Sequence, residues 1–311
     1  MTYPWLQEVE REFVERLQGE RLAHALLLSG PVECGKAELA MAFLVSALCL
    51  EGTYPACGAC RSCQLMSSGA HPDGHVLTFE ENPNKAGELR KELVIDQVRR
   101  LTASLFLTNT ISRRKGALIH PVEAMNQNTA NALLKTLEEP PGDTLLILVS
   151  HDPARLPATI RSRCQNLHVR TPEPETALGW IESKTGVDSE RAAQALVAAA
   201  GSPLRAARML QDGGAEQYLQ INQTLDALLD RSTAMGGALK SLGEVDPERL
   251  WSWISLRTAE LVRQAAQDGG NLQALSALQR QADLNRGLSR TPVRKDLLLQ
   301  DWLIQWSRLN A

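Results

Sequence analysis

The chain has 311 residues, 43% of them hydrophobic and 22% charged, with a formal net charge of −3, which predicts a globular protein of two or three domains. The slightly acidic balance disfavours strong direct DNA binding, and no apolar run approaches the roughly 18 residues that span a membrane. The first eight residues lack the basic and apolar segments of a signal peptide, so we expect a cytoplasmic protein.

The first half of the chain alternates short apolar strands with amphipathic helices. Strands are predicted at 24–29, 75–78, 115–120, 144–150 and 165–169. Helices are predicted between them at 38–50, 95–105 and 126–138, the last of which is stopped by two prolines. This alternation favours a parallel sheet that is covered by helices on both faces.

The second half of the chain is helical throughout. After a proline-rich segment at 171–174, strand patterns vanish, and short helices are predicted at 177–184, 189–200 and 204–211. A Gly-Gly pair at 213–214 marks another break, and helical patterns continue from there to the end. Four tryptophans in this region, which we expect to pack in a core, are Trp251, Trp253, Trp302 and Trp306. The expected fold class is therefore α/β followed by all-α.

A degenerate phosphate-binding loop follows the first predicted strand. Gly30 and Gly35 are separated by four residues and followed by Lys36, as the G-x-x-x-x-G-K pattern requires. In such a loop, backbone N–H groups and a helix N-terminus face the phosphates, and the lysine adds a positive charge. The next residue should be Ser or Thr, whose hydroxyl holds Mg²⁺, but here it is Ala37. The alternative is an inherited turn that now only packs.

Four cysteines crowd into residues 49–63 in the order Cys49, Cys57, Cys60 and Cys63. In a reducing compartment such a cluster indicates a metal site before it indicates disulfides. Four thiolates are the number that a closed, structural zinc site needs, and the pairs at 58–59 and 61–62 suggest tight turns between the ligands. Unligated buried thiols are the less favoured alternative.

The end of the third predicted strand has lost the acidic residues that an ATPase places there. In such enzymes one carboxylate binds the metal and a second often orients the attacking water. Here His120 and Pro121 occupy those positions, and Glu123 lies further along the chain. Together with Ala37, this loss predicts a site that does not hydrolyse ATP.

Several arginines follow the fourth predicted strand, in a proline-containing segment at 151–164 that we expect at the surface, leading to a short helix. Exposed arginines usually form a solvated face. Alternatively, an arginine can reach the phosphates bound by a partner and stabilise charge during phosphoryl transfer. Composition alone does not choose between these two possibilities.

With these features assembled, the chain resembles the clamp-loader family of AAA+ proteins. The resemblance is carried by 29–37, the cysteine cluster, 71–73, 129–141 and 162–164, and the Asn-Ala-Leu-Leu-Lys-Thr-Leu-Glu-Glu-Pro-Pro and Ser-Arg-Cys runs are its most diagnostic pieces. It is specific over residues 1 to about 210 and rests on helical character beyond that point.

The resemblance implies a domain order and a set of partners. The implied domains are an AAA+ ATPase-like domain over 1–170 with a zinc module at about 49–73, a three-helix lid over 171–212, and a helical collar that oligomerises over 213–311. The implied partners are the motor subunits and the delta subunit of a five-subunit DNA polymerase III clamp loader, and through them a sliding clamp and primed DNA.

The family pattern also implies a catalytic role for one arginine of this chain, whereas a second arginine of the family is not matched here. Arg163 matches the Ser-Arg-Cys arginine, which acts in trans on the ATP site of a neighbouring motor subunit. Leu204 falls where the motors have a nucleotide-sensing lid arginine, with Arg205 one residue late. We therefore expect a non-hydrolysing subunit that is not an enzyme on its own. Two alternatives stay open, an active motor ATPase and a zinc-knuckle module that binds nucleic acid.

Overall fold

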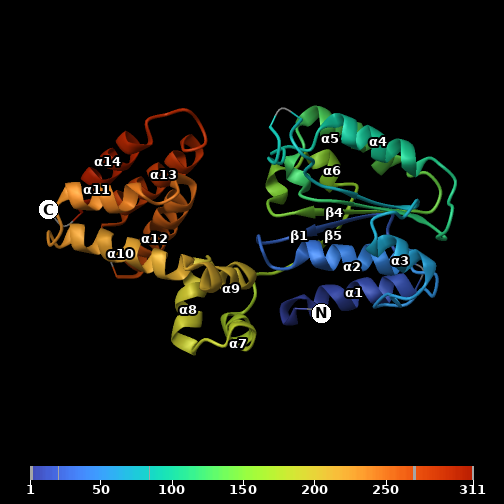
Figure 1. The fold of residues 1–311 in the computed structure, drawn as a ribbon, viewed down its shortest axis with the longest axis horizontal. Helices are drawn as coiled ribbons and strands as arrows, with labels where there is room; N and C mark the ends of the chain where they lie inside the picture. The colour runs from blue at the N-terminus through green and yellow to red at the C-terminus, as the bar shows by residue number, and fades with distance from the viewer. Residues whose placement is uncertain (1–2, 20, 84, 269–270, 310–311) are drawn as a thin grey trace. The chain divides into compact units, whose positions relative to one another are not determined.

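The computed structural model describes residues 3–19, 21–83, 85–268 and 271–309 (Figure 1). The outermost residues of the expected domains, 1–2 and 310–311, lie outside this description. The chain divides into two compact units, Met1–Trp180 with Ser202–Leu204 and Ile181–Gly201 with Arg205–Ala311. Each unit is described separately below. The three-domain division expected from the sequence stays a prediction.

The first unit is built on a five-stranded parallel sheet with the order β2-β3-β4-β1-β5. The strands are β1 Ala25–Ser29, β2 Gly74–Leu77, β3 Lys115–Ile119, β4 Thr144–Ser150 and β5 Gln165–His168. All five predicted strands are thus confirmed within one residue at each end. Every residue of β1, β3 and β4 is buried, which explains their nearly continuous apolar sequences.

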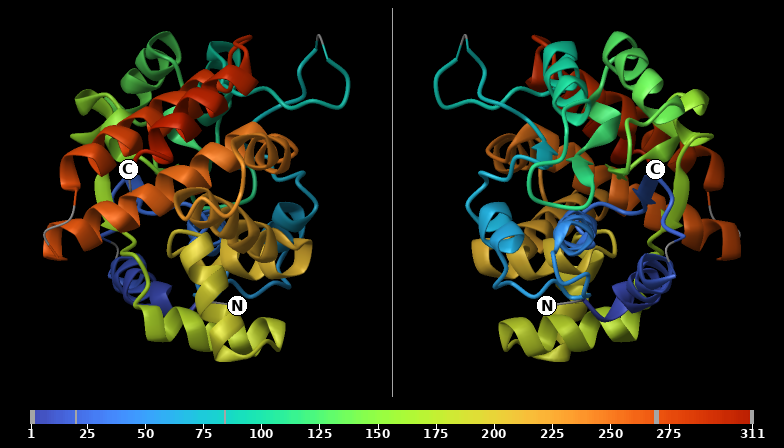
Figure 2. Two further views of the ribbon diagram at one scale, coloured as in Figure 1. Left: turned by 90° about the vertical axis from the view of Figure 1, so that its left-hand side faces the viewer. Right: turned by 90° about the vertical axis from the view of Figure 1, so that its right-hand side faces the viewer.

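Helices cover both faces of this sheet (Figure 1). One face carries α1 Gln7–Gln18, α2 Lys36–Leu48 and α3 Arg61–Ser67, and the other carries α4 Ile95–Leu105, α5 Gln127–Glu138 and α6 Ala158–Arg161. Alternate residues of β1 pack in two different cores. Leu26 and Leu28 pack with Phe13 and Phe43 on one face of the sheet, whereas Leu27 packs in the core on the other face. The segment between β2 and α4 extends from the unit as a long loop (Figure 2).

Several helix boundaries differ from those expected. Helix α2 begins at Lys36, directly after Gly35 in a left-handed conformation, and ends at Leu48 rather than at residue 50 because Cys49 is extended. Helices α1 and α3 were not predicted. Residues 61–62, where a turn was expected, form the first turn of α3 with Cys60 as its N-cap. By contrast, the expected helix at 95–105 is confirmed at both ends.

The second unit is all-helical, so the expected fold class is confirmed. It contains α8 Ser189–Ala198, α10 Gly214–Leu229, α11 Met235–Gly243, α12 Pro247–Asp268, α13 Leu272–Leu288 and α14 Lys295–Trp306. The helices α7 Pro174–Thr185 and α9 Pro203–Asp212 begin in the first unit and continue in the second. None of the helices in the described ranges combines the length and apolar character needed to cross a membrane.

Tryptophans form the centre of the helical unit, as predicted. All four expected core tryptophans are at most 2% exposed. Trp302 stacks on Trp306 with ring centroids 5.1 Å apart, and both indole N–H groups donate to backbone carbonyls. The indole of Trp253 donates to the carbonyl of Ala198 at the end of α8 and so ties α8 to α12. Satisfied N–H groups allow these large rings to be buried without a polar penalty.

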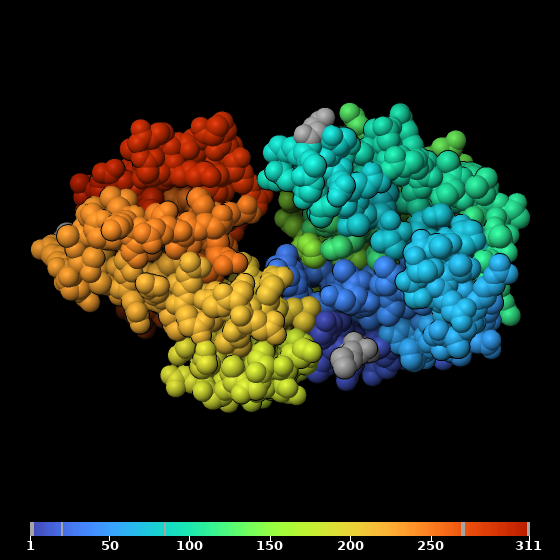
Figure 3. Space-filling view, viewed as in Figure 1, coloured from blue at the N-terminus to red at the C-terminus, as the bar shows by residue number. Residues whose placement is uncertain are grey.

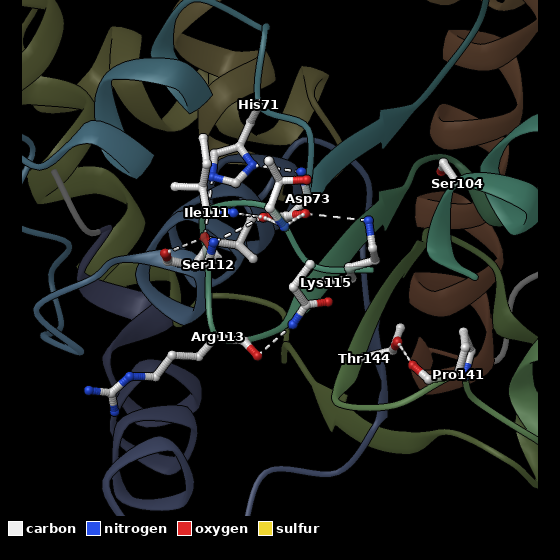
Figure 4. A network of polar contacts seen from close by, with 12 residues as sticks. His71, Asp73, Ser104, Ile111, Ser112, Arg113, Lys115, Pro141 and Thr144 are labelled. Carbon is white, nitrogen blue, oxygen red and sulfur yellow. Dashed lines mark hydrogen bonds and ion pairs between the residues drawn. The ribbon is translucent and has the colours of Figure 1, made fainter. Parts of the chain in front are cut away.

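A buried ion pair joins two distant segments of the α/β unit (Figure 4). The Asp73 carboxylate accepts hydrogen bonds from the backbone N–H groups of Thr110, Ile111 and Ser112, and lies 3.4 Å from Lys115 Nζ. Both ionic side chains are almost fully buried. Burial alone raises the pKa of Asp73, but the backbone hydrogen bonds outweigh it and hold the pKa below its usual range.

We expect Asp73→Ala to lower the free energy of unfolding by about 3–5 kcal/mol, because it leaves a buried ammonium and three N–H groups without partners. Urea denaturation of the full chain measures this. Asp96→Ala, which removes an exposed pair with Arg99, is the control and should cost less than about 1 kcal/mol. Equal effects of the two substitutions would contradict the importance of the buried pair.

The same network predicts a pH dependence. Because the folded-state pKa of Asp73 is depressed, its stabilising contribution is present above the pKa of the unfolded carboxyl and is lost as the pH falls through the folded value.

Candidate functional site

The phosphate-binding loop lies between β1 and α2 and is shaped by glycines that no other residue could replace. Gly30 has a φ of 145°, and a Cβ atom there would lie 2.2 Å from the carbonyl oxygen of Val169. Gly35 has a φ of 83°, and its Cβ would lie 2.3 Å from the ring of Tyr3. Both positions therefore exclude side chains on grounds of space and of backbone strain.

Groups of the protein itself surround this loop. Tyr3 and Trp5 stack with centroids 5.3 Å apart, and both meet Trp180 edge to face. The indole of Trp5 donates to the carbonyl of Cys34 at 2.9 Å, and the hydroxyl of Ser202 donates to the carbonyl of Val32 at 2.9 Å. Sequence reasoning missed these four residues, which lie far from the loop in the chain and belong to no recognisable pattern.

Lys36 is 2% exposed and bonds to the loop itself. Its ammonium donates to the carbonyl of Pro31, and within the described residues it has no ion pair with a carboxylate. Desolvation lowers the pKa of Lys36 to about 8, although the negative charge of Glu123 acts in the opposite direction. Ala37 follows in the first turn of α2 and offers no oxygen to a metal.

The residues that follow β3 and β4 meet beside this lysine. The imidazole rings of His120 and His151 contact each other edge to face, with centroids 5.2 Å apart. The backbone N–H of His151 donates to Glu123 Oε1 at 2.9 Å, while no protein group in the described residues bonds to Glu123 Oε2. Sequence reasoning did not assign His151 to this site.

Both histidines are neutral in the folded protein at pH 7. Burial lowers the pKa of His120, and burial together with the charge of Lys36 lowers the pKa of His151 to about 4. Magnesium is a hard cation that binds oxygen ligands. Ala37 and the two imidazoles supply none, so the positions expected to hold magnesium offer no side-chain oxygen. The neighbouring Glu123 carboxylate still has one oxygen, Oε2, that no protein group in the described residues bonds.

The four cysteines of the cluster come together as the sequence predicted, with Cys49 and Cys63 buried and Cys57 exposed. The segment that follows α2 and carries them is part of the face drawn in Figure 3. Their sulfur atoms all lie within 4.8 Å of one another. Cys49 Sγ is 3.6 Å from Cys57 Sγ and 3.9 Å from Cys60 Sγ, and Cys57 Sγ is 3.9 Å from Cys63 Sγ. Sulfur atoms at about 2.3 Å from a tetrahedral metal lie about 3.8 Å apart, so the spacing fits a metal ion.

Backbone groups further support a metal site at these cysteines. The N–H of Cys60 donates to Cys57 Sγ at 3.3 Å, and the N–H of Cys63 donates to Cys60 Sγ at 3.5 Å. Ser62 lies between two of the ligands, and its hydroxyl bonds to the carbonyl of Leu48 and to His71. His71 in turn accepts from the N–H of Asp73, so the cluster is connected to the buried ion pair at β3.

Arg163 lies just beyond α6, in the surface segment that the sequence predicted. Its Nη1 donates to the carbonyl of Thr159 at 2.9 Å, and its Nη2 lies 2.5 Å from Glu138 Oε1. The Arg163 side chain is 35% exposed. Next to it, burial raises the pKa of Cys164 to about 12, so this thiol stays protonated and packs against the core. The partnership with Glu138 was not anticipated from the sequence.

The parallel sheet with a phosphate loop after its interior strand β1 defines a P-loop α/β domain, here followed by helices. The family described as "DNA polymerase III, delta subunit" matches residues 5–173. A DNA polymerase III subunit delta′ from Pseudomonas aeruginosa is 36% identical over 310 residues, covering 97% of this chain and 89% of that protein. The chain belongs to the DNA polymerase III delta′ family.

Other relatives agree with this assignment. The subunit delta′ proteins of Escherichia coli and Yersinia pestis are 34% and 30% identical, covering 79% and 98% of this chain and 71% and 95% of their own lengths. Among solved structures, a DNA polymerase III gamma subunit-related protein from Thermotoga maritima has a TM-score of 0.43 at 16% identity, covering 99% of this chain and all of that one. The assignment rests on the sequence relatives.

Proposed function

We propose that this chain is the non-hydrolysing delta′ subunit of a DNA polymerase III clamp loader and donates Arg163 to the ATP site of a neighbouring motor subunit. The observation that carries the proposal is the contrast between the two sites, because Arg163 is held at the surface while the chain's own phosphate loop lacks metal ligands. Family membership supports the partners, which are the motor and delta subunits of a five-subunit ring in the cytoplasm.

The proposal assigns a different role to each of three regions of the chain. The region 1–170 would act as an ATPase-like scaffold, 171–212 as a lid, and 213–311 as the collar that closes the ring. ATP hydrolysis by the motors would then drive loading of the sliding clamp on primed DNA. The tryptophan core of the helical unit supports the collar role, because it gives that unit a core of its own.

Loss of hydrolysis in this chain follows from several missing groups rather than one. Restoring the hydroxyl at position 37 returns one metal ligand, but the imidazoles of His120 and His151 stay neutral and supply no oxygen.

We expect purified Ala37→Thr to hydrolyse ATP no faster than the wild-type chain, with both at background. A steady-state phosphate-release assay with magnesium measures this, and a chain with Lys36→Ala provides the background. Steady turnover by the wild-type chain that Lys36→Ala abolishes would contradict the non-hydrolysing role and favour a motor ATPase.

We expect Arg163→Ala to lower ATP turnover at the partner site that it serves by on the order of 10³-fold, the effect typical of an arginine finger. The measurement is ATP turnover and clamp loading by the complete clamp loader reconstituted with this chain. Arg161→Ala is the matched control, because Arg161 is an exposed neighbour two residues away. Wild-type loading by the Arg163→Ala complex would refute the role in trans.

We further infer that Cys49, Cys57, Cys60 and Cys63 hold a structural zinc ion, whose chemistry here is to cross-link the segment that follows α2. We expect one zinc ion per purified chain by elemental mass spectrometry. Cys63→Ser should lose the metal and lower the melting temperature, whereas Cys34→Ser, at a buried cysteine outside the cluster, should keep it. Full zinc content in Cys63→Ser would exclude this ligand set.

A further inference from the structure

The backbone that carries Arg163 is anchored on both sides of the residue. Ile160 is completely buried, and its carbonyl accepts the N–H of Arg163 at 3.1 Å. Cys164 packs against the same core beneath α5 and α6. The side chain of Arg163, by contrast, is long and 35% exposed, so packing alone does not determine where its guanidinium points.

Neighbouring groups restrain that guanidinium, and the weakest of these contacts is the one from Nη1 to the Ser162 hydroxyl at 3.5 Å. The carbonyl of Thr159 accepts from Nη1 at 2.9 Å, and the carboxylate of Glu138 lies 2.5 Å from Nη2. An arginine has five N–H donors, so these contacts leave others for a second anion. Within the described residues, ion pairs form at Arg163 but not at its neighbours Arg155 and Arg161.

Glu138 is placed for this contact by the end of α5. It is the last residue of the helix, whereas Glu139 has left the helical conformation with φ −129° and ψ 74°. A carboxylate in the last turn of a helix lies at the negative end of the helix dipole, which is unfavourable. The carboxylate of Glu138 therefore does not stabilise helix α5. Its ion pair with Arg163, across the contact between α5 and α6, offsets this unfavourable interaction with the helix dipole.

We propose that Glu138 is a positioning residue that holds the Arg163 guanidinium in the orientation needed to meet phosphate bound by the partner subunit. This inference rests on the proposed trans role of Arg163. A pre-oriented cation does not need to be ordered when charge develops in the transition state, so its effect falls on turnover rather than on nucleotide binding. The opposite possibility is that Glu138 masks Arg163 and competes with the phosphate.

The experiment compares Glu138→Ala, Glu138→Gln and Glu139→Ala in the complete clamp loader reconstituted with this chain. We expect Glu138→Ala to lower kcat at the Arg163-dependent site about two- to fivefold, the size of effect that a half-exposed ion pair can exert, without changing KM for ATP. Glu138→Gln keeps an oxygen that accepts from Nη2 and should restore most of the loss. Glu139→Ala, an exposed neighbour, should behave as wild type.

Combining Glu138→Ala with Arg163→Ala separates this proposal from the one on which it rests. If Glu138 acts through Arg163, the double variant should turn over ATP at the rate of Arg163→Ala alone. If the Arg163→Ala complex is defective but the Glu138→Ala complex is fully active, only the positioning role is overturned. An increase in ATP turnover by the Glu138→Ala complex would also overturn the positioning role, because it would indicate that Glu138 masks Arg163. A fully active Arg163→Ala complex would overturn the trans role itself. Unchanged melting temperatures would show that these variants fold.

Discussion

The parallel pairing of β1, β3 and β4 is the constraint on which the site depends. Because the three strands run side by side in the same direction, the segments that follow them emerge at one edge of the sheet. This brings the phosphate loop, the turn with His120 and Glu123, and His151 together, although they are far apart in the sequence. The segment after β4 continues from His151 to Arg163. It therefore contributes one residue to the site within this chain and another residue that is proposed to act on a partner subunit.

The conformation of the phosphate loop does not depend on the groups that would bind a metal ion. The glycines of the loop are required by Val169 and Tyr3, which are parts of the protein and not of a nucleotide. Trp5 and Ser202 bond to backbone carbonyls of the loop and hold it in place. The loop conformation is therefore stabilised by contacts within the protein that do not involve Ala37 or His120. This separation between support and catalysis is what the proposed non-hydrolysing role requires.

The sequence predicted those features that depend on local pattern. The apolar run at 144–150 and the amphipathic segment at 95–105 were predicted at their observed bounds, because burial follows the periodicity of the chain. The cysteine spacing likewise predicted a cluster. The contacts of Ser202 with Val32 and of Glu138 with Arg163 could not be predicted, because they join residues that only the tertiary fold brings together. The partners of Asp73 were missed for the same reason, although residues 71–73 were among those that carry the family resemblance.

Lys36 and Lys115 are both buried in the α/β unit, but they differ in whether a carboxylate balances their charge. Lys115 faces the Asp73 carboxylate, so its charge is balanced within the protein. Lys36 donates to the carbonyl of Pro31 and has no ion pair among the described residues, and desolvation lowers its pKa to about 8, although the charge of Glu123 acts in the opposite direction. An ammonium buried without a counter-ion is costly, and a phosphate loop normally receives its negative charge from the nucleotide. The missing metal ligands therefore bear on the proposed loss of hydrolysis, whereas the Lys36 ammonium, which lacks an ion pair among the described residues, bears on anion binding.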